Sequence, residues 1–359
     1  MARQHLLLTA DALGGVWQYS TDLVWALQPF GHDVTLAVLG PAPTPAQRAE
    51  AAAIPNLHLV ETGLELDWLA QSATPILAAE AGLAEMAADL RVDVVQLHTP
   101  ALVSAGRFPC PVIAALHSCV ATWWAAAGQG PMPEDFAWRT DLVQRGLERA
   151  TLAIAPSAAF ARAARRHYGV APVPVHNGRA LAIPRHAMHD HVFTAGRLWD
   201  EGKNMRVLDE AASMLAVPFR AAGPLKAPHG GAIALKALQP MGTLDTAALT
   251  SHLGTRPVFA SAALYEPFGL AVLEAAIAGC ALVLSDIPTF RELWNGAAHF
   301  VDPRDPRGFA TAIQDLLGDS AARVEAGQRA QARARRYSVE AMASRMAAHY
   351  AALRRRVAA

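Results

Sequence analysis

The stretch YEPFGLAVLEAAIAGCALVLSD, residues 265–286, decides the fold of this chain. Pro267 suits the first position of a helix, and the sequence predicts that this helix continues through 268–278. Gly279 is the residue type expected just after a helix end. The apolar run over 281–285 then predicts a buried strand. A helix followed so closely by an apolar strand is typical of an α/β fold when the rest of the chain repeats the alternation.

The alternation recurs along the chain. Apolar runs predict further strands at His5–Ala10, Asp33–Gly40, Leu57–Val60, Val92–His98, Pro111–His117, Thr151–Ser157, Val173–Gly178, His191–Gly196 and Pro257–Ser261. Helical spacing predicts helices at 16–30, 76–90, 205–215, 307–317, 321–336 and 338–356, the last with Ser338 as its N-cap. Strands that alternate with helices predict doubly wound parallel sheets.

Length and an aperiodic segment predict two domains. The chain has 359 residues, more than one typical domain. The stretch GRALAIPRHAMHDH, 178–191, lacks periodicity. We therefore expect domains at 1–179 and 191–336, joined by a linker at 180–190, with a C-terminal helical segment at 337–359. Two α/β halves imply a cleft in which ligands bind at the C-terminal strand ends.

Composition excludes several classes of protein. Hydrophobic residues make up 53% of the chain and charged residues 17%, which supplies two cores and argues against disorder. Positive and negative residues number 31 each, so no nucleic-acid partner is expected. The three cysteines form no CxxC pair. The N-terminal apolar run is too short for a signal peptide. No apolar run approaches the roughly 20 residues of a membrane-spanning helix. The expectation is a cytoplasmic protein, with attachment to the inner face of the membrane left open.

Two loops carry features of phosphate sites. Gly15 opens a helix after the strand-like run 5–10, where backbone N–H groups favour an anion, although such turns are also common without a ligand. In AGRLWDEGKN, 195–204, Arg197 follows a strand and Lys203 precedes a helix. The segment is one residue too long for a Walker A loop, and Asn204 replaces its Ser or Thr. An Arg fork and a Lys point charge suit a diphosphate, whereas the alternative is a solvated charged turn.

Glu266 and Glu274 flank the start of the helix predicted in the opening stretch. The eight-residue separation places the carboxylates roughly 10–12 Å apart. Free N–H groups at Gly269 and Leu270 lie between them and suit a phosphate. A nucleotide-sugar, with hydroxyls at both ends and a diphosphate between them, has this layout. The alternative for Glu274 is a buried ion pair, for which Arg291 and Arg197 are the candidates.

These motifs together resemble glycosyltransferase family 4, a retaining family. Glu266 and Glu274 form its E-x7-E pattern, and YEPFGLAVLEAAIAGCALVLSDIPTFREL closely resembles its donor-site signature. AGRLWDEGKN is similar to the Arg/Lys phosphate segment. LGGV, FGHDVTLAV, VVQLHTP, AALHS, IAPSAAFAR and VHNG are similar to further landmarks in the expected order. The resemblance therefore covers nearly the whole chain.

The resemblance implies a GT-B fold, in which two Rossmann-like doubly wound domains face across a cleft. The N-terminal domain would bind the acceptor, the C-terminal domain the nucleotide-sugar, and the last helix would cross back to the N-terminal domain. The residues implied in donor binding are Gly15, Arg197, Lys203, Glu266, Phe268, Gly269, Leu270 and Glu274. Those implied in catalysis are His117, Arg197, Lys203 and Glu266. Glu274 would bind the ribose, and Glu266 the donor sugar.

The implied activity is retaining transfer of a hexosyl group from a nucleotide-diphosphate sugar to a hydroxyl of a saccharide, lipid-linked or small-molecule acceptor. The setting would be polysaccharide or glycoconjugate assembly. Neither a metal nor a cofactor beyond the donor substrate is expected. A nucleotide-sugar 2-epimerase of the same fold and a non-catalytic nucleotide-sugar-binding protein are the alternatives.

Other residues leave alternatives open. His98 either faces the cleft or is structural. His186, His189 and His191 are clustered, but without the carboxylate or cysteine pattern that supports a metal site. Trp123, Trp124 and Trp138 either pack in the protein or contact a sugar or lipid carrier, with packing favoured.

Overall fold

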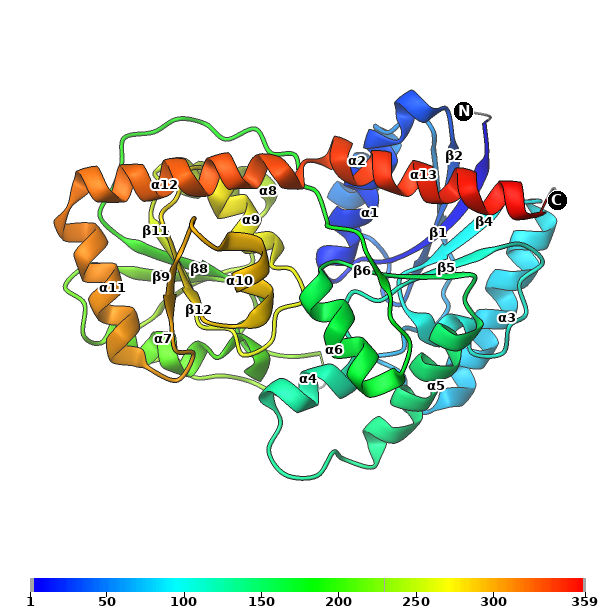
Figure 1. Cartoon of the computed structure of the whole chain (residues 1–359), viewed down its shortest axis with the longest axis horizontal. Coiled ribbons are helices and arrows are strands. Elements are labelled where there is room, and N and C mark those ends of the chain that lie inside the picture. Colours follow the sequence, from blue (N-terminus) through cyan, green and yellow to red (C-terminus); the bar gives the residue numbers. More distant parts are fainter. Residues whose placement is uncertain (1–2, 229, 358–359) are drawn as a thin grey trace. The chain divides into compact units, whose positions relative to one another are not determined.

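The chain folds into two α/β units in the computed structural model, which describes residues 3–228 and 230–357 (Figure 1). One unit holds the chain up to Gly178 together with helix α13 (Val339–Val357). The other holds Arg179–Ser338, including the segment 180–190 that was expected to be a linker. The chain therefore leaves the first unit at Gly178 and returns to it at Val339.

The first unit has a seven-stranded parallel sheet in the order β3-β2-β1-β4-β5-β6-β7. Its strands are β1 (His5–Asp11), β2 (Asp33–Leu39), β3 (Leu57–Glu61), β4 (Val94–Leu97), β5 (Val112–Ala115), β6 (Leu152–Ala155) and β7 (Val173–Pro174). Its other helices are α1 (Gly15–Ala26), α2 (Pro45–Ala52), α3 (Ala73–Asp89), α4 (Val120–Ala127), α5 (Asp135–Arg149) and α6 (Ala158–Tyr168). The order reverses between β1 and β4, which makes this edge a topological switch point.

Helix α13 belongs to the first unit because its apolar stripe is buried there. Met342, Met346 and Tyr350 recur every four residues and are at most 1% exposed. They pack in one cluster with Leu6 and Leu8 of β1. Residues four apart lie on one helix face, so the spacing itself creates the packing surface.

The second unit has a six-stranded parallel sheet in the order β10-β9-β8-β11-β12-β13. Its strands are β8 (Val192–Ala195), β9 (Phe219–Ala222), β10 (Gln239–Gly242), β11 (Val258–Ser261), β12 (Leu282–Ser285) and β13 (His299–Val301). Its helices are α7 (Met205–Ala212), α8 (Thr246–Gly254), α9 (Leu270–Ile277), α10 (Pro288–Trp294), α11 (Pro306–Gly318) and α12 (Ser320–Ala334). The order reverses between β8 and β11.

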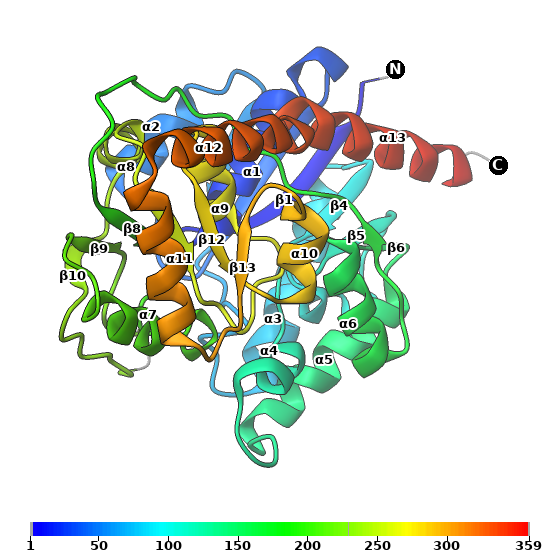
Figure 2. The same cartoon turned by 60° about the vertical axis from the view of Figure 1, so that its left-hand side comes forward.

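Both faces of this second sheet are buried. Leu282 and Leu284 lie in one apolar cluster with α9 and α10, whereas Val283 lies in another with α7 and α11. Successive residues of a strand point to opposite faces, so a continuous apolar run such as ALVLS requires helices on both sides (Figure 2).

The helix predicted to begin near Pro267 begins three residues later, at Leu270. Gly269 precedes it with φ +91° and ψ +69°, which a right-handed helix does not allow. The segment 267–269 is therefore a turn, and the prediction of Pro267 as the first helical residue is wrong. The carboxylate of Glu274 accordingly lies in the second turn of a shorter helix.

Gly146 of α5 allows the closest backbone approach in the first unit. A Cβ atom at this position would lie 1.7 Å from the carbonyl oxygen of Pro100. Gly82 of α3 is a matched control, since a Cβ atom there would lie 3.5 Å from the side chain of Leu64. We expect Gly146→Ala to lower the stability by about 1–3 kcal/mol, whereas Gly82→Ala should raise it by about 0.5–1 kcal/mol. Urea unfolding measures both, and equal effects would contradict this packing.

Candidate functional site

The loop after β8 is shaped by two glycines. A Cβ atom on Gly223, which follows β9 with φ +135°, would lie 1.7 Å from the carbonyl oxygen of Gly196. Only glycine fits there, because the two backbones touch. The Cε atom of Lys203 lies 3.7 Å from the Cβ position of Gly196. The aliphatic part of Lys203 therefore crosses directly over the end of the strand.

Asp200 and Asn204 hold the 3₁₀ turn Glu201–Lys203 in place. The Asp200 carboxylate accepts from the backbone N–H of Gly202 at 2.9 Å and from the Arg197 guanidinium at 3.1 Å. Asn204 has φ +56°, and its amide donates to the carbonyl oxygens of Ala262 (2.9 Å) and Pro303 (2.7 Å). Asn204, which stands where a Walker A loop has Ser or Thr, thus has a structural role.

The same turn binds the loop that carries Glu266. The carbonyl oxygen of Gly202 accepts from the backbone N–H groups of Leu264 (2.9 Å) and Tyr265 (3.1 Å). Lys203 Nζ donates to Glu266 Oε2 at 2.5 Å. These two side chains are only 18% and 15% exposed. Two motifs 63 residues apart are thus brought together at the ends of the adjacent strands β8 and β11, where the strand order reverses.

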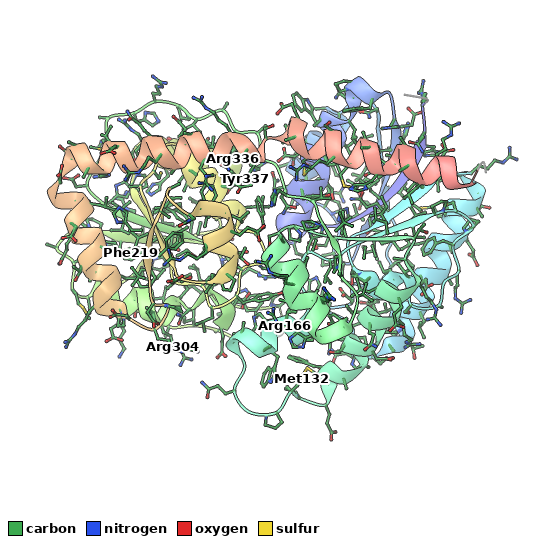
Figure 3. The ribbon with its side chains drawn as sticks, viewed as in Figure 1. Met132, Arg166, Phe219, Arg304, Arg336 and Tyr337 are labelled. Atoms are coloured by element: carbon green, nitrogen blue, oxygen red, sulfur yellow. The ribbon has the colours of Figure 1, made fainter. Side chains whose placement is uncertain are left out.

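The start of α9 is packed closely against this loop. A Cβ atom on Gly269 would lie 3.2 Å from Glu266 Cγ and 3.2 Å from the ring of Phe290. Leu270 is the first helical residue, so the N–H groups at this end lie beside Glu266. Phe268 is 3% exposed, and its ring packs edge-on against Tyr337, which is labelled in Figure 3. Its side chain belongs to the core, and only its backbone is left to face a ligand.

Glu274 pairs with Arg179, which was predicted to end the first domain but is the first residue of the second unit. Arg179 Nε donates to Glu274 Oε1 at 2.9 Å, and the side chains are 6% and 11% exposed. Burial raises the pKa of Glu274 above its ordinary 4.5, while Arg179 opposes that rise. Within the described residues, Glu274 Oε2 accepts no hydrogen bond.

The two arginines proposed as partners of Glu274 are paired elsewhere. Arg291 donates to Asp286 at 2.6 Å, and Arg197 donates to Asp200. The alternative of a buried ion pair at Glu274 therefore occurs, but its arginine is neither of the two candidates. Arg197 remains 48% exposed at the side chain.

The first unit places its two candidate residues after β1 and after β5, at the C-terminal ends of its strands. Gly15 is exposed and begins α1, directly after β1. His117 follows β5, and its Nε2 lies 2.7 Å from Nδ1 of His98, which follows β4. Burial lowers the pKa of His117 to about 4 and that of His98 well below 6.5. Both rings are therefore neutral near pH 7, and His98 is a direct partner of His117.

The candidates His186, His191, Trp123 and Trp124 contact other protein side chains. His191 Nε2 lies 3.1 Å from His252 Nε2, and His186 lies 3.5 Å from Ser251 Oγ. Trp123 and Trp124 pack against the Phe136 ring at centroid distances of 6.4 and 5.8 Å. In the described residues, no group of three or more His, Cys, Asp or Glu side chains is arranged to hold a metal ion. Nor is any described helix both long and apolar enough to cross a bilayer.

Family models match both halves of the chain. Residues 13–181 match the model described as Glycosyltransferase Family 4, and residues 189–319 match the model described as Glycosyl transferases group 1. Together the two matches support a glycosyltransferase of the GT-B type, in which each domain matches a different model. The predicted pair of Rossmann-like domains is confirmed.

Individual relatives agree with this class. The glycogen synthases of two Mycobacterium tuberculosis strains, CDC 1551 / Oshkosh and ATCC 25618 / H37Rv, are 40% identical over 90 residues. That match covers 24% of this chain and 22% of each relative. Sucrose-phosphate synthase from Thermosynechococcus elongatus has a similar structure, with a TM-score of 0.79, 17% identity and coverage of 98% and 99% of the two chains. Anabaena HepE in complex with UDP-glucose is also similar in structure, with a TM-score of 0.73 and 18% identity. That match covers 98% of this chain and 100% of HepE.

Sequence reasoning missed Arg179, Asp200 and Gly223. An isolated glutamate in an apolar helix signals a buried basic partner, but the partner lies 95 residues away. Asp200 is visible as a capping residue in front of a turn. Gly223 gives no sequence signal, because its role comes from contact with another strand end.

The Arg179–Glu274 pair predicts a stability effect. Arg179→Met leaves a buried carboxylate without its partner and should cost about 3–5 kcal/mol, whereas Arg179→Met with Glu274→Met should recover most of the loss. Arg291→Met removes an exposed, solvent-screened ion pair and should cost much less than Arg179→Met. Urea unfolding of the wild type and the three variants tests this. Similar losses of stability in Arg179→Met and Arg291→Met would contradict the larger contribution of the buried pair.

Buried neutral histidines predict a pH effect. Burial lowers the pKa of His117 and of His191 to about 4. Between pH 7 and 5 the unfolded chain takes up protons on these rings that the folded chain does not, so stability falls as the pH falls. We expect a lower thermal midpoint at pH 5 than at pH 7, and a smaller drop in His191→Gln. An unchanged midpoint in the wild type would argue against neutral rings.

Proposed function

We propose that this protein is a retaining, metal-independent glycosyltransferase that moves a sugar from a nucleotide-diphosphate sugar to an acceptor hydroxyl. The observation that carries the proposal is the Lys203–Glu266 ion pair. It lies at the switch point of the second unit, beside the exposed Arg197 and the start of α9. Two cationic groups and free helix N–H groups in one place suit a diphosphate.

The positive groups would stabilise the leaving diphosphate. In the reaction, the bond from the anomeric carbon to the β-phosphate oxygen breaks and negative charge grows on the phosphate. Lys203, Arg197 and the backbone N–H groups at Gly269 and Leu270 would act by electrostatic stabilisation. Glu266 holds the lysine over Gly196 until a phosphate oxygen competes for it, and it would then be available to hydroxyls of the donor sugar.

Glu274 would bind the other end of the donor. Arg179 holds its Oε1, so the orientation of the carboxylate is fixed. Its Oε2 is free to accept from the ribose hydroxyls. The pair therefore supports the ribose role of Glu274 through orientation, rather than competing with it.

Retention would not involve a covalent glycosyl-enzyme. Retaining glycosidases need carboxyl groups about 5 Å apart, whereas eight residues along a loop and a helix separate these two by roughly 10 Å. We propose front-face attack: the acceptor oxygen bonds to the anomeric carbon, the bond to the β-phosphate breaks, and the acceptor proton passes to the leaving phosphate.

UDP-glucose is the first donor to test, since one of the similar structures, that of Anabaena HepE, is a complex with UDP-glucose. The first unit, with Gly15 after β1 and His117 after β5, would hold the acceptor. A saccharide, lipid-linked or small-molecule acceptor would place the enzyme in polysaccharide or glycoconjugate assembly. A cytoplasmic location, with or without contact to the inner membrane face, suits a nucleotide-sugar donor.

Donor binding and turnover test this proposal. A thermal-shift panel of UDP-, GDP-, ADP- and CMP-sugars selects the donor, and its turnover is then measured with a panel of acceptors. Lys203→Met and Arg197→Ala should each lower kcat/KM by about 10²–10³, the cost of one transition-state charge contact. Arg329→Ala, which removes an exposed arginine of α12, is the control.

The outcomes separate the alternatives. Transfer to an acceptor that depends on Lys203 and Arg197 supports the proposal. Conversion of the donor to its 2-epimer without any acceptor would identify an epimerase. Donor binding without turnover would indicate a binding protein. Full activity in both variants would show that this site is not where the reaction occurs.

A further inference from the structure

A chain of polar side chains runs through the core of the first unit, from α13 to His117. Tyr350 Oη lies 2.5 Å from Gln96 Oε1. Gln96 Nε2 lies 3.5 Å from His98 Nε2, and His98 Nδ1 lies 2.7 Å from His117 Nε2. Tyr350 and Gln96 are fully buried, so their polar atoms depend on each other rather than on water.

The first contact fixes the orientation of the glutamine amide. A separation of 2.5 Å lies at the short limit of O–H···O hydrogen bonds and below the range of N–H···O hydrogen bonds. The Tyr350 hydroxyl therefore donates to the amide oxygen of Gln96. Burial raises the pKa of Tyr350 well above 10, so its proton is retained. The amide nitrogen consequently points the other way, toward Tyr19 and His98.

The orientation of the amide then decides the tautomer of His98. The amide nitrogen of Gln96 can only donate a hydrogen bond, so His98 Nε2 is the acceptor in this contact. The Ser20 hydroxyl, 3.5 Å from the same nitrogen, can also donate to it. A neutral ring that accepts at Nε2 carries its proton at Nδ1. His98 Nδ1–H therefore donates to His117 Nε2.

We propose that Gln96 and Tyr350 are positioning residues that fix His117 as the Nδ1–H tautomer. With Nε2 occupied as an acceptor, the one remaining polar group of the His117 ring is an N–H donor. This N–H group suits a hydroxyl oxygen of a bound sugar, and that part rests on the proposed function. Helix α13, more than 200 residues from His117 in the sequence, would thus set the chemistry of a site residue.

The tautomer is measured directly by ¹⁵N NMR of histidine-labelled protein at pH 7.5, because protonated and unprotonated ring nitrogens have different shifts. The chain has 14 histidines, so His98→Asn and His117→Asn identify the relevant signals. We expect His117 protonated at Nδ1 and unprotonated at Nε2. His117 protonated at Nε2, or with both nitrogens averaged in the wild type, would overturn the proposal.

Two variants test the role of the chain. Tyr350→Phe removes the hydroxyl that orients the amide, and Gln96→Met removes the donor to His98. Each should give averaged ¹⁵N shifts at His117. Tyr337→Phe is the matched control, since it removes a buried hydroxyl that donates to Leu293 in the second unit. Unchanged His117 shifts in both test variants, or equal changes in the control, would contradict the proposal.

Activity supplies a separate readout. Tyr350→Phe should lower kcat by about tenfold, the equivalent of one neutral hydrogen bond, and leave the affinity for the free nucleoside diphosphate unchanged. A general loss of packing would change both. If the tautomer is as expected but no sugar is transferred by the wild type, the proposed function fails while the tautomer assignment stands.

Discussion

The ion pair between Lys203 and Glu266 is the interaction on which the candidate donor site depends. It joins the loops after β8 and β11, the two strands between which the sheet order reverses. The contacts around it serve to hold that pair. Gly196 gives the lysine a surface to lie on, the Gly202 carbonyl binds the backbone of the Glu266 loop, and Asn204 ties the turn to the strand ends. Open α/β sheets bind ligands at this position, so the topology and the charges indicate the same place.

Two further constraints complete the arrangement. In the second unit, the pair formed by Arg179 and Glu274 places a fixed carboxylate inside an apolar helix, at a desolvation cost that only a partner can offset. In the first unit, α13 returns to the sheet and buries Tyr350 at the end of a polar chain that reaches His117. Each unit thus combines an apolar core with one buried polar feature.

Much of the fold could be predicted from the sequence, because apolar runs bounded by Gly and Pro predict buried strands and ALVLS and HLLLTA are clear examples. Short or charged elements were missed: β9 contains Arg220, and α5 is largely polar. The predicted start of α9 was wrong because Gly269 adopts a left-handed φ, which the apolar pattern of the sequence does not indicate. The E-x7-E motif indicated that Glu266 and Glu274 belong to the candidate site. Their partners depend on three-dimensional proximity, and only Lys203 had been singled out from the sequence.

We expect Lys203 to exchange Glu266 for a diphosphate when the donor binds. A crystal structure of the protein with UDP tests this exchange most directly, through the distance from Lys203 Nζ to its nearest acceptor. We predict that Nζ lies about 2.7–2.9 Å from a diphosphate oxygen, with the ribose hydroxyls on Glu274 and the Arg179 contact intact. A diphosphate bound elsewhere, with Lys203 still on Glu266, would contradict the proposed donor site.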